Sequence, residues 1–148
     1  MQESDSMEDD PAPDGTARGE MDALLDQCLG FAIQMLEKRG GFIPFGASID
    51  SSGQPRFNAT YDGNEHPAPT DEIELLYDGF AKNAPELRAT AVCSDVSMSD
   101  GHDGGVRVEI EHRDINPITC FLPYWRKRKK FTFDEVFAVR GEPRVFPK

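Results

Sequence analysis

The sequence predicts a single α+β domain, in which two helices pack on an antiparallel sheet of about five strands. Two segments place apolar residues at the spacing of a helix, whereas most others alternate apolar and polar residues as half-buried strands do. The second half of the chain reads as successive strands with no helix between them, which is typical of an antiparallel sheet. A length of 148 residues gives room for one domain of ordinary size.

An acidic tail is expected to precede this domain. Residues 1–19 are rich in Asp, Glu, Ser, Pro and Gly, and residues 1–20 hold seven acids against Arg18 alone. Such a segment has too few apolar side chains to offset its ordering entropy. We therefore predict a disordered acidic tail over residues 1–19 and the folded domain over residues 20–148.

The first helix is expected to begin at about Glu20. Apolar residues recur on one face from Met21 to Leu36, and Gly40-Gly41 ends the pattern. Acids lead and bases trail along this segment, which suits the helix dipole.

A β-hairpin should follow, with strands near residues 42–50 and 54–60 and a turn between them. Residues 61–69 have the composition of a loop. The segment from Phe42 to Phe45 is apolar and contains Pro44. It is suited either to packing against the first helix or to lining an exposed groove, and packing is the favoured interpretation.

The second helix is expected from Thr70, which can cap it, to about Asn83. Strands should then cover residues 87–97, 106–111 and 118–124, with a short closing element at 131–137 and an edge at 145–146. On the strand 106–111, Glu109 and Glu111 alternate with apolar residues, so both are expected on a solvated face.

This order of elements, α-β-β-α-β-β-β over residues 20–140, resembles the profilin-like and roadblock-like architectures. A second resemblance rests on three segments: residues 41–47 (GFIPFGA), residues 122–124 (LPY) before a basic run, and residues 141–146 (GEPRVF). Together they resemble a family of small uncharacterised bacterial proteins. Neither resemblance implies any functional residue.

Composition narrows the function classes. The formal net charge of −11 disfavours non-specific binding to nucleic acid, because phosphate repels an acidic protein. Cys28, Cys93 and Cys120 lack any metal-ligand spacing and are expected as buried thiols in a reducing compartment. With no secretory signal and no long apolar stretch, the expected location is cytoplasmic. No cofactor or metal is predicted.

The strongest local signal is a basic run flanked by aromatic residues. A hairpin of this composition can meet an acidic protein surface, track a nucleic-acid backbone, contact an anionic membrane, or simply be a solvated turn that protects a sheet edge. The acidic tail can also screen it. The candidate partner-binding residues are Tyr124, Trp125, Arg126, Lys127, Arg128, Lys129, Lys130 and Phe131.

Two weaker signals are also present. The loop from Asp95 to Asp103 offers carboxylates and His102 but lacks a calcium-loop pattern, so a solvated turn is favoured. No motif of a known enzyme class is present. A hydrolase that uses His112 or His66 requires a pocket where a histidine meets a carboxylate.

The sequence therefore favours a non-catalytic protein-binding module, which is an adaptor or an inhibitor of the immunity type. The alternative is a nucleic-acid or nucleotide binder that uses residues 124–131. Whether the protein is an enzyme is left open, and the oligomeric state is not predicted.

Overall fold

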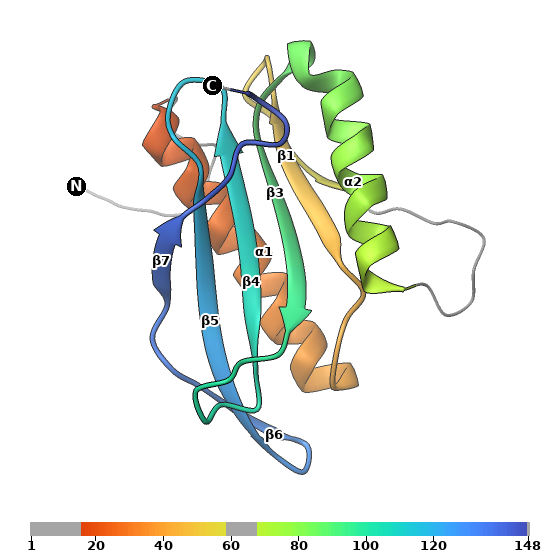
Figure 1. The fold of residues 1–148 in the computed structure, drawn as a ribbon, viewed down its shortest axis with the longest axis vertical. Coiled ribbons are helices and arrows are strands. Elements are labelled where there is room, and N and C mark those ends of the chain that lie inside the picture. Colours follow the sequence, from red (N-terminus) through yellow and green to blue (C-terminus); the bar gives the residue numbers. More distant parts are fainter. Residues whose placement is uncertain (1–15, 59–67, 148) are drawn as a thin grey trace.

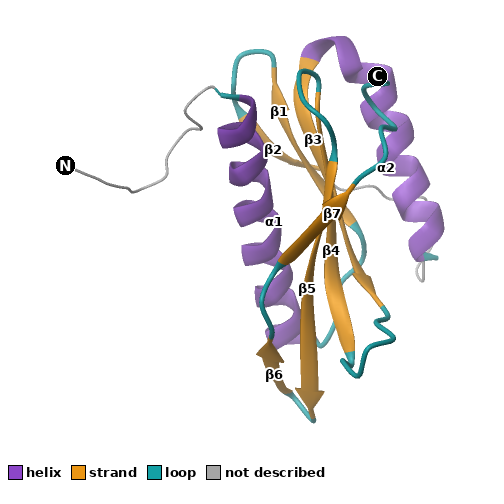
Figure 2. Cartoon of the chain, turned by 60° about the vertical axis from the view of Figure 1, so that its left-hand side comes forward, coloured by secondary structure: helices purple, strands orange, loops and turns teal. Residues whose placement is uncertain are grey.

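The computed structural model describes residues 16–58 and 68–147. They form three layers, with α1 on one face of a curled antiparallel sheet and α2 on the other (Figures 1 and 2). The elements are α1 (Ala17–Arg39), β1 (Phe45–Asp50), β2 (Pro55–Asn58), α2 (Pro69–Asn83), a 3₁₀ turn (Ala84–Glu86), β3 (Leu87–Val96), β4 (Gly104–His112), β5 (Ile118–Lys127), β6 (Lys130–Phe133) and β7 (Phe137–Arg140).

The α+β class is confirmed, with two more strands than expected. The strand order is β2-β1-β3-β4-β5-β6, and β7 also pairs with β5. All of these pairings are antiparallel. The two extra strands are β6 and β7, which take the place of the single closing element expected at 131–137.

Helix α1 begins at Ala17, three residues before the expected start. The side chain of Thr16 accepts a hydrogen bond from the N–H of Gly19 and caps the helix. Residues 16–19, which we expected in the tail, therefore belong to the folded domain. At the other end Gly40 has φ of 80°, a left-handed conformation that glycine adopts without steric cost.

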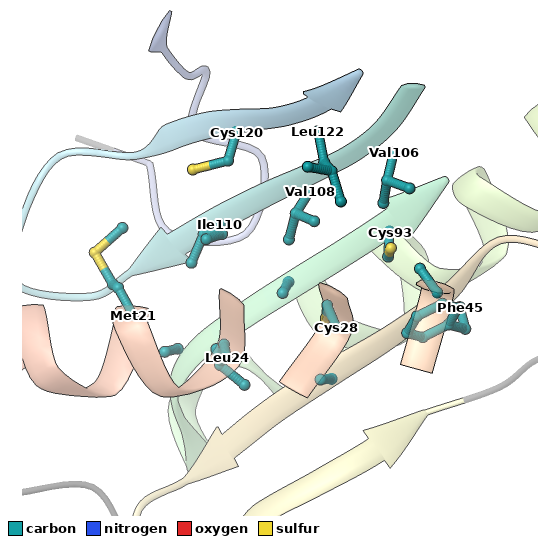
Figure 3. Close-up of a cluster of buried hydrophobic side chains, with 14 of the residues drawn as sticks. Met21, Leu24, Cys28, Phe45, Cys93, Val106, Val108, Ile110, Cys120 and Leu122 are labelled. Carbon is teal, nitrogen blue, oxygen red and sulfur yellow. The ribbon is translucent and has the colours of Figure 1, made fainter. Parts of the chain in front are cut away.

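The main core lies between α1 and the sheet (Figure 3). Met21, Leu24 and Cys28 on α1 face apolar side chains of β3, β4 and β5 and are almost fully buried. The predicted burial of the three thiols is confirmed, and none forms a disulfide. Burial raises the pKa of Cys93 and Cys120, which holds both thiols protonated at neutral pH.

A smaller core lies between α2 and the opposite face of the sheet. The ring of Phe80 approaches β1 so closely that a Cβ at Gly46 would lie 2.9 Å from its Cζ. The expected capping role of Thr70 is wrong: the N-cap is Ala68, which makes no side-chain cap, and Pro69 occupies the first turn. Proline suits this position because its missing N–H has no helical partner there.

The C-terminal segment is held by a buried carboxylate. Glu111 accepts hydrogen bonds from the backbone N–H groups of Arg144, Val145 and Phe146 at 2.9–3.1 Å. Our prediction of a solvated face is wrong for Glu111, which is 3% exposed. The expected edge strand at 145–146 is also absent, because these amides bind a side chain instead of a neighbouring strand.

Candidate functional site

The predicted basic site is the hairpin formed by β5 and β6. The two strands pair from Tyr124 with Phe133 to Lys127 with Lys130, so the chain reverses through Arg128 and Lys129 alone. Arg128 has φ of 59°, the left-handed conformation, and no other non-glycine residue of the described chain has a positive φ. Glycine or asparagine is the usual residue at such a position.

The two aromatic residues that bound the run belong to the core. Tyr124 and Phe131 are 7% and 8% exposed, and their rings meet edge-to-face at 5.2 Å. The Tyr124 hydroxyl donates to Oδ1 of Asp95 at 2.7 Å. Burial and this carboxylate raise the pKa of Tyr124. Their side chains therefore support the hairpin and are not available to a partner.

Arg126 fixes the hairpin against the end of α1. Its Nη1 donates to the carbonyl of Gly40 at 3.3 Å, and its Nε donates to the carbonyl of Arg128 at 2.8 Å. Its guanidinium also lies over the ring of Phe131, 5.1 Å from the centroid. Gly40 follows the last turn of the helix, where a cation also interacts favourably with the helix dipole.

This docking brings the last turn of α1 to the same end of the molecule as the hairpin (Figure 2). Lys38 and Arg39 are exposed there and, with Lys129, line a depression of about 160 Å³ between helix and hairpin. These two bases lie outside the run from which the sequence predicts the site. We call the combined surface the basic end: Lys38, Arg39, Arg126, Lys127, Arg128, Lys129 and Lys130.

The basic end concentrates charge in an acidic protein. It holds seven of the 16 lysine and arginine residues of a chain whose net charge is −11. Lys127 through Lys130 are exposed and line a second, shallower depression together with Phe131 and Glu37. Of the residues that the structure describes, Glu37 is the one acid that lines either depression.

Trp125 lies on the face of the hairpin opposite to Arg126 and Phe131, which it shares with Lys127 and Lys130. Its ring lies against that of His102 in a tilted arrangement, with centroids 4.5 Å apart. The two ring nitrogens of His102 contact Asp100 at 2.6 Å and Asp134 at 2.9 Å. These hydrogen bonds raise the pKa of His102 and lower those of both aspartates. Trp125 itself is 42% exposed.

The polar side chains of the acidic loop make hydrogen bonds within the fold. His102 is paired with aspartates as described, Asp103 accepts the backbone N–H of Arg126, and Asp95 accepts from Tyr124. Among the described residues no group of three or more potential ligands is arranged to hold a metal ion.

A histidine does meet a carboxylate in the core. Asp114 donates its backbone N–H to Nδ1 of His112, so Nε2 carries the proton and donates to Oε1 of Glu20 at 2.8 Å. Nη1 of Arg88 donates to the other oxygen of Glu20 at 2.7 Å. His112 and Glu20 are each 2% exposed, so this contact joins α1 to the sheet and offers a substrate no access. His66, the other histidine considered for catalysis, lies outside the described residues.

Comparison with known proteins does not assign this chain to a family. No family model, no curated protein and no solved structure matches the chain. Within the described ranges, no helix has both the length and the apolar character needed to cross a membrane.

Proposed function

We propose that this protein is a non-catalytic protein-binding module, an adaptor or an inhibitor, whose basic end binds an acidic segment of its partner. The observation that carries the proposal is the gathering of Lys38 and Arg39 with the five bases of the hairpin. Oppositely charged surfaces accelerate the encounter of two proteins and select the correct partner.

The hairpin supports this proposal because Lys127, Arg128 and Lys130 do not favour its own folding. Lys127 and Lys130 face each other directly across the two strands, where like charges are destabilising. Arg128 occupies a left-handed position that costs an ordinary residue about 1 kcal/mol. Charged side chains protect a sheet edge from pairing with another chain, and this role accounts for some of the bases. Binding accounts for the remaining bases better than stability does.

A nucleic-acid or nucleotide binder is the second candidate. An exposed Trp125 next to a basic hairpin favours it, since aromatic rings stack on bases in single-stranded binders. Asp100 and Asp134 contact the histidine next to that tryptophan, however, and Asp103 binds the neighbouring backbone, so their carboxylates oppose a phosphate close to Trp125. We therefore rank an acidic protein segment first.

Charge reversal tests the proposal. The full-length protein is titrated into a fluorescein-labelled peptide of alternating Glu and Ser, and into a single-stranded oligonucleotide of equal charge. The test variant is Lys127→Glu/Lys130→Glu, which keeps two like charges opposed in the hairpin. The matched control is Lys82→Glu/Arg140→Glu, which changes net charge equally at two other exposed positions.

We expect the wild type and the control to bind the peptide more tightly than the oligonucleotide, with an affinity that falls as salt rises. The hairpin variant should lose at least tenfold in affinity for the peptide. Preference for the oligonucleotide would favour the second candidate. Equal affinity of the hairpin variant and the control for the peptide would show that the basic end does not contribute to binding.

A further inference from the structure

An apolar depression of about 360 Å³ lies beside the basic end. One wall is a stripe on α1 formed by Phe31, Met35 and Arg39, which are one helical turn apart. The other wall is the segment 41–45, which follows the helix stop at Gly40. A concave apolar surface of this size lies at the small end of the range for binding pockets and suits one or two side chains.

The segment 41–45 is divided between the core and the surface. Phe45 is buried, and its ring meets Phe31 edge-to-face at 4.9 Å. Pro44 is buried as well, and its ring restricts the backbone at this point. Ile43, in contrast, is 56% exposed on the wall of the depression. Both interpretations of this apolar segment therefore apply, each to different residues.

The edge strand extends the same apolar surface. Phe57 of β2 is 51% exposed, and its ring lies 5.4 Å from that of Phe31. A single exposed apolar residue needs no explanation, whereas a contiguous patch around a depression is typical of an interaction site.

The depression is continuous with the basic end through Arg39. This arginine lines both the apolar depression and the depression between α1 and the hairpin, where Lys38 and Lys129 also lie. A ligand that occupies both must therefore be apolar at one point and negatively charged next to it. Phe31 precedes Arg39 by two helical turns, which is about 12 Å along the axis. An extended peptide covers that distance in about four residues.

We propose that the depression receives one bulky apolar side chain of the same partner segment whose acidic residues bind the basic end. The ligand is an extended peptide in which an aromatic residue or leucine is followed, within about four residues, by a run of acids. This inference rests on the proposed function and adds the anchor that distinguishes one acidic partner from another. The supporting evidence is the concavity, its continuity with Arg39 and the charge complementarity.

The test uses two labelled peptides of equal charge. The first carries a tryptophan, a three-residue spacer of Gly and Ser, and five glutamates, and the second replaces the tryptophan with serine. Both are titrated by fluorescence anisotropy into the full-length wild type and into Ile43→Ser. The matched control is Val136→Ser, since Val136 is 43% exposed and does not line the depression. The hairpin variant Lys127→Glu/Lys130→Glu is measured alongside.

The wild type should bind the tryptophan peptide about tenfold more tightly than the serine peptide, as expected for partial burial of an aromatic side chain. Ile43→Ser should reduce that ratio at least threefold, and Val136→Ser should leave it unchanged. Both peptides should bind the hairpin variant weakly.

Equal affinity of the wild type for the two peptides would overturn the anchor while leaving the proposed function in place, provided that both still depend on the hairpin. If the hairpin variant binds both peptides as tightly as the wild type does, the proposed function is overturned instead. Two other occupants would also overturn the anchor. If the protein prefers the tryptophan peptide over the serine peptide only after residues 1–15 are removed, the depression is assigned to the chain's own acidic segment. Loss of binding to phosphatidylserine vesicles in Ile43→Ser, without peptide discrimination, would assign it to lipid.

Discussion

Nε2 of His112 lies 2.8 Å from Oε1 of Glu20, although 92 residues separate them in the sequence. This buried contact ties the first turn of α1 to the end of β4, and Arg88 completes the pairing of the carboxylate from β3. A charge removed from water in this way is tolerated because each oxygen of Glu20 has a hydrogen-bond donor.

Glu20→Gln should therefore lower the free energy of unfolding by about 2 kcal/mol. The amide keeps the size of the side chain, but its NH₂ group then faces either the donor of His112 or that of Arg88. Urea denaturation at neutral pH measures the loss. Glu135→Gln, an exposed substitution, is the control, and an equal midpoint for the two variants would contradict a stabilising role for the buried contact.

Glu111→Ala should release the C-terminal segment. The carboxylate accepts three backbone N–H groups, and their loss should cost about 3 kcal/mol. Hydrogen exchange should show faster exchange at residues 144–146 than elsewhere in the core. Glu142→Ala, on the same segment but exposed, should leave those amides protected. Unchanged protection in Glu111→Ala would mean that apolar packing alone holds the segment.

The contacts of His102 predict a dependence of stability on pH. Because Asp100 and Asp134 raise the pKa of His102, its stabilisation is complete below the ordinary histidine value of about 6.5. It disappears as pH rises through the raised value in the folded protein. The two aspartates have lowered pKa values, so their stabilisation is present above about pH 4 and is lost in stronger acid.

The contact should therefore be strongest between about pH 4 and pH 6.5. An NMR titration of the His102 ring should give a pKa above the ordinary value, and the urea midpoint should fall between pH 6 and pH 8.5. His102→Asn should remove most of that fall. A His102 that titrates at or below its ordinary value would refute the contact.

Arg128→Gly separates stability from binding. Glycine removes a left-handed cost of about 1 kcal/mol but loses part of this gain to greater freedom in the unfolded chain, so the net gain should be about 0.5 kcal/mol. The affinity for the acidic peptide should fall severalfold, because a charge at the tip of the hairpin is lost. If the variant gains stability and keeps its full affinity for the peptide, Arg128 does not belong to the binding surface.

Removal of residues 1–15 should change the affinity for the acidic peptide less than threefold. These residues join the described chain at the start of α1, whereas the basic end lies at the last turn of that helix, and 23 residues of helix span about 35 Å. We therefore expect their acids to contribute little to the charge around the hairpin. A tenfold gain in affinity on truncation would contradict this estimate.

The two helices and most strands could be predicted because their patterns are local. The apolar stripe of α1 and the alternation in β4 depend only on residues next to one another. The strand before the basic run was expected to end at Tyr124, and the element after the run to begin at Phe131. They continue because the inward-facing Tyr124 and Phe131 keep the hairpin paired.

The candidate site was predictable only in part, because its completion is long-range. The hairpin was recognisable from five consecutive bases, but Lys38 and Arg39 join it through a contact between Arg126 and Gly40, 86 residues apart. In the same way, the burial of Glu111 depends on amides 33–35 residues further along the chain. The residue pattern within a single helix or strand cannot predict contacts between residues so far apart in the sequence.

The close approach of Phe80 to Gly46 has an evolutionary consequence. Any other residue at position 46 would bring its Cβ to 2.9 Å from the ring of Phe80 and 3.2 Å from the carbonyl of Ala91, so that one of them must shift, whereas no such constraint acts on the exposed bases of the hairpin. Sequences that share ancestry with this chain should keep this glycine, together with a carboxylate at the position of Glu111, even where the hairpin charges have diverged. Those two positions can therefore trace descent of the scaffold independently of what each descendant binds.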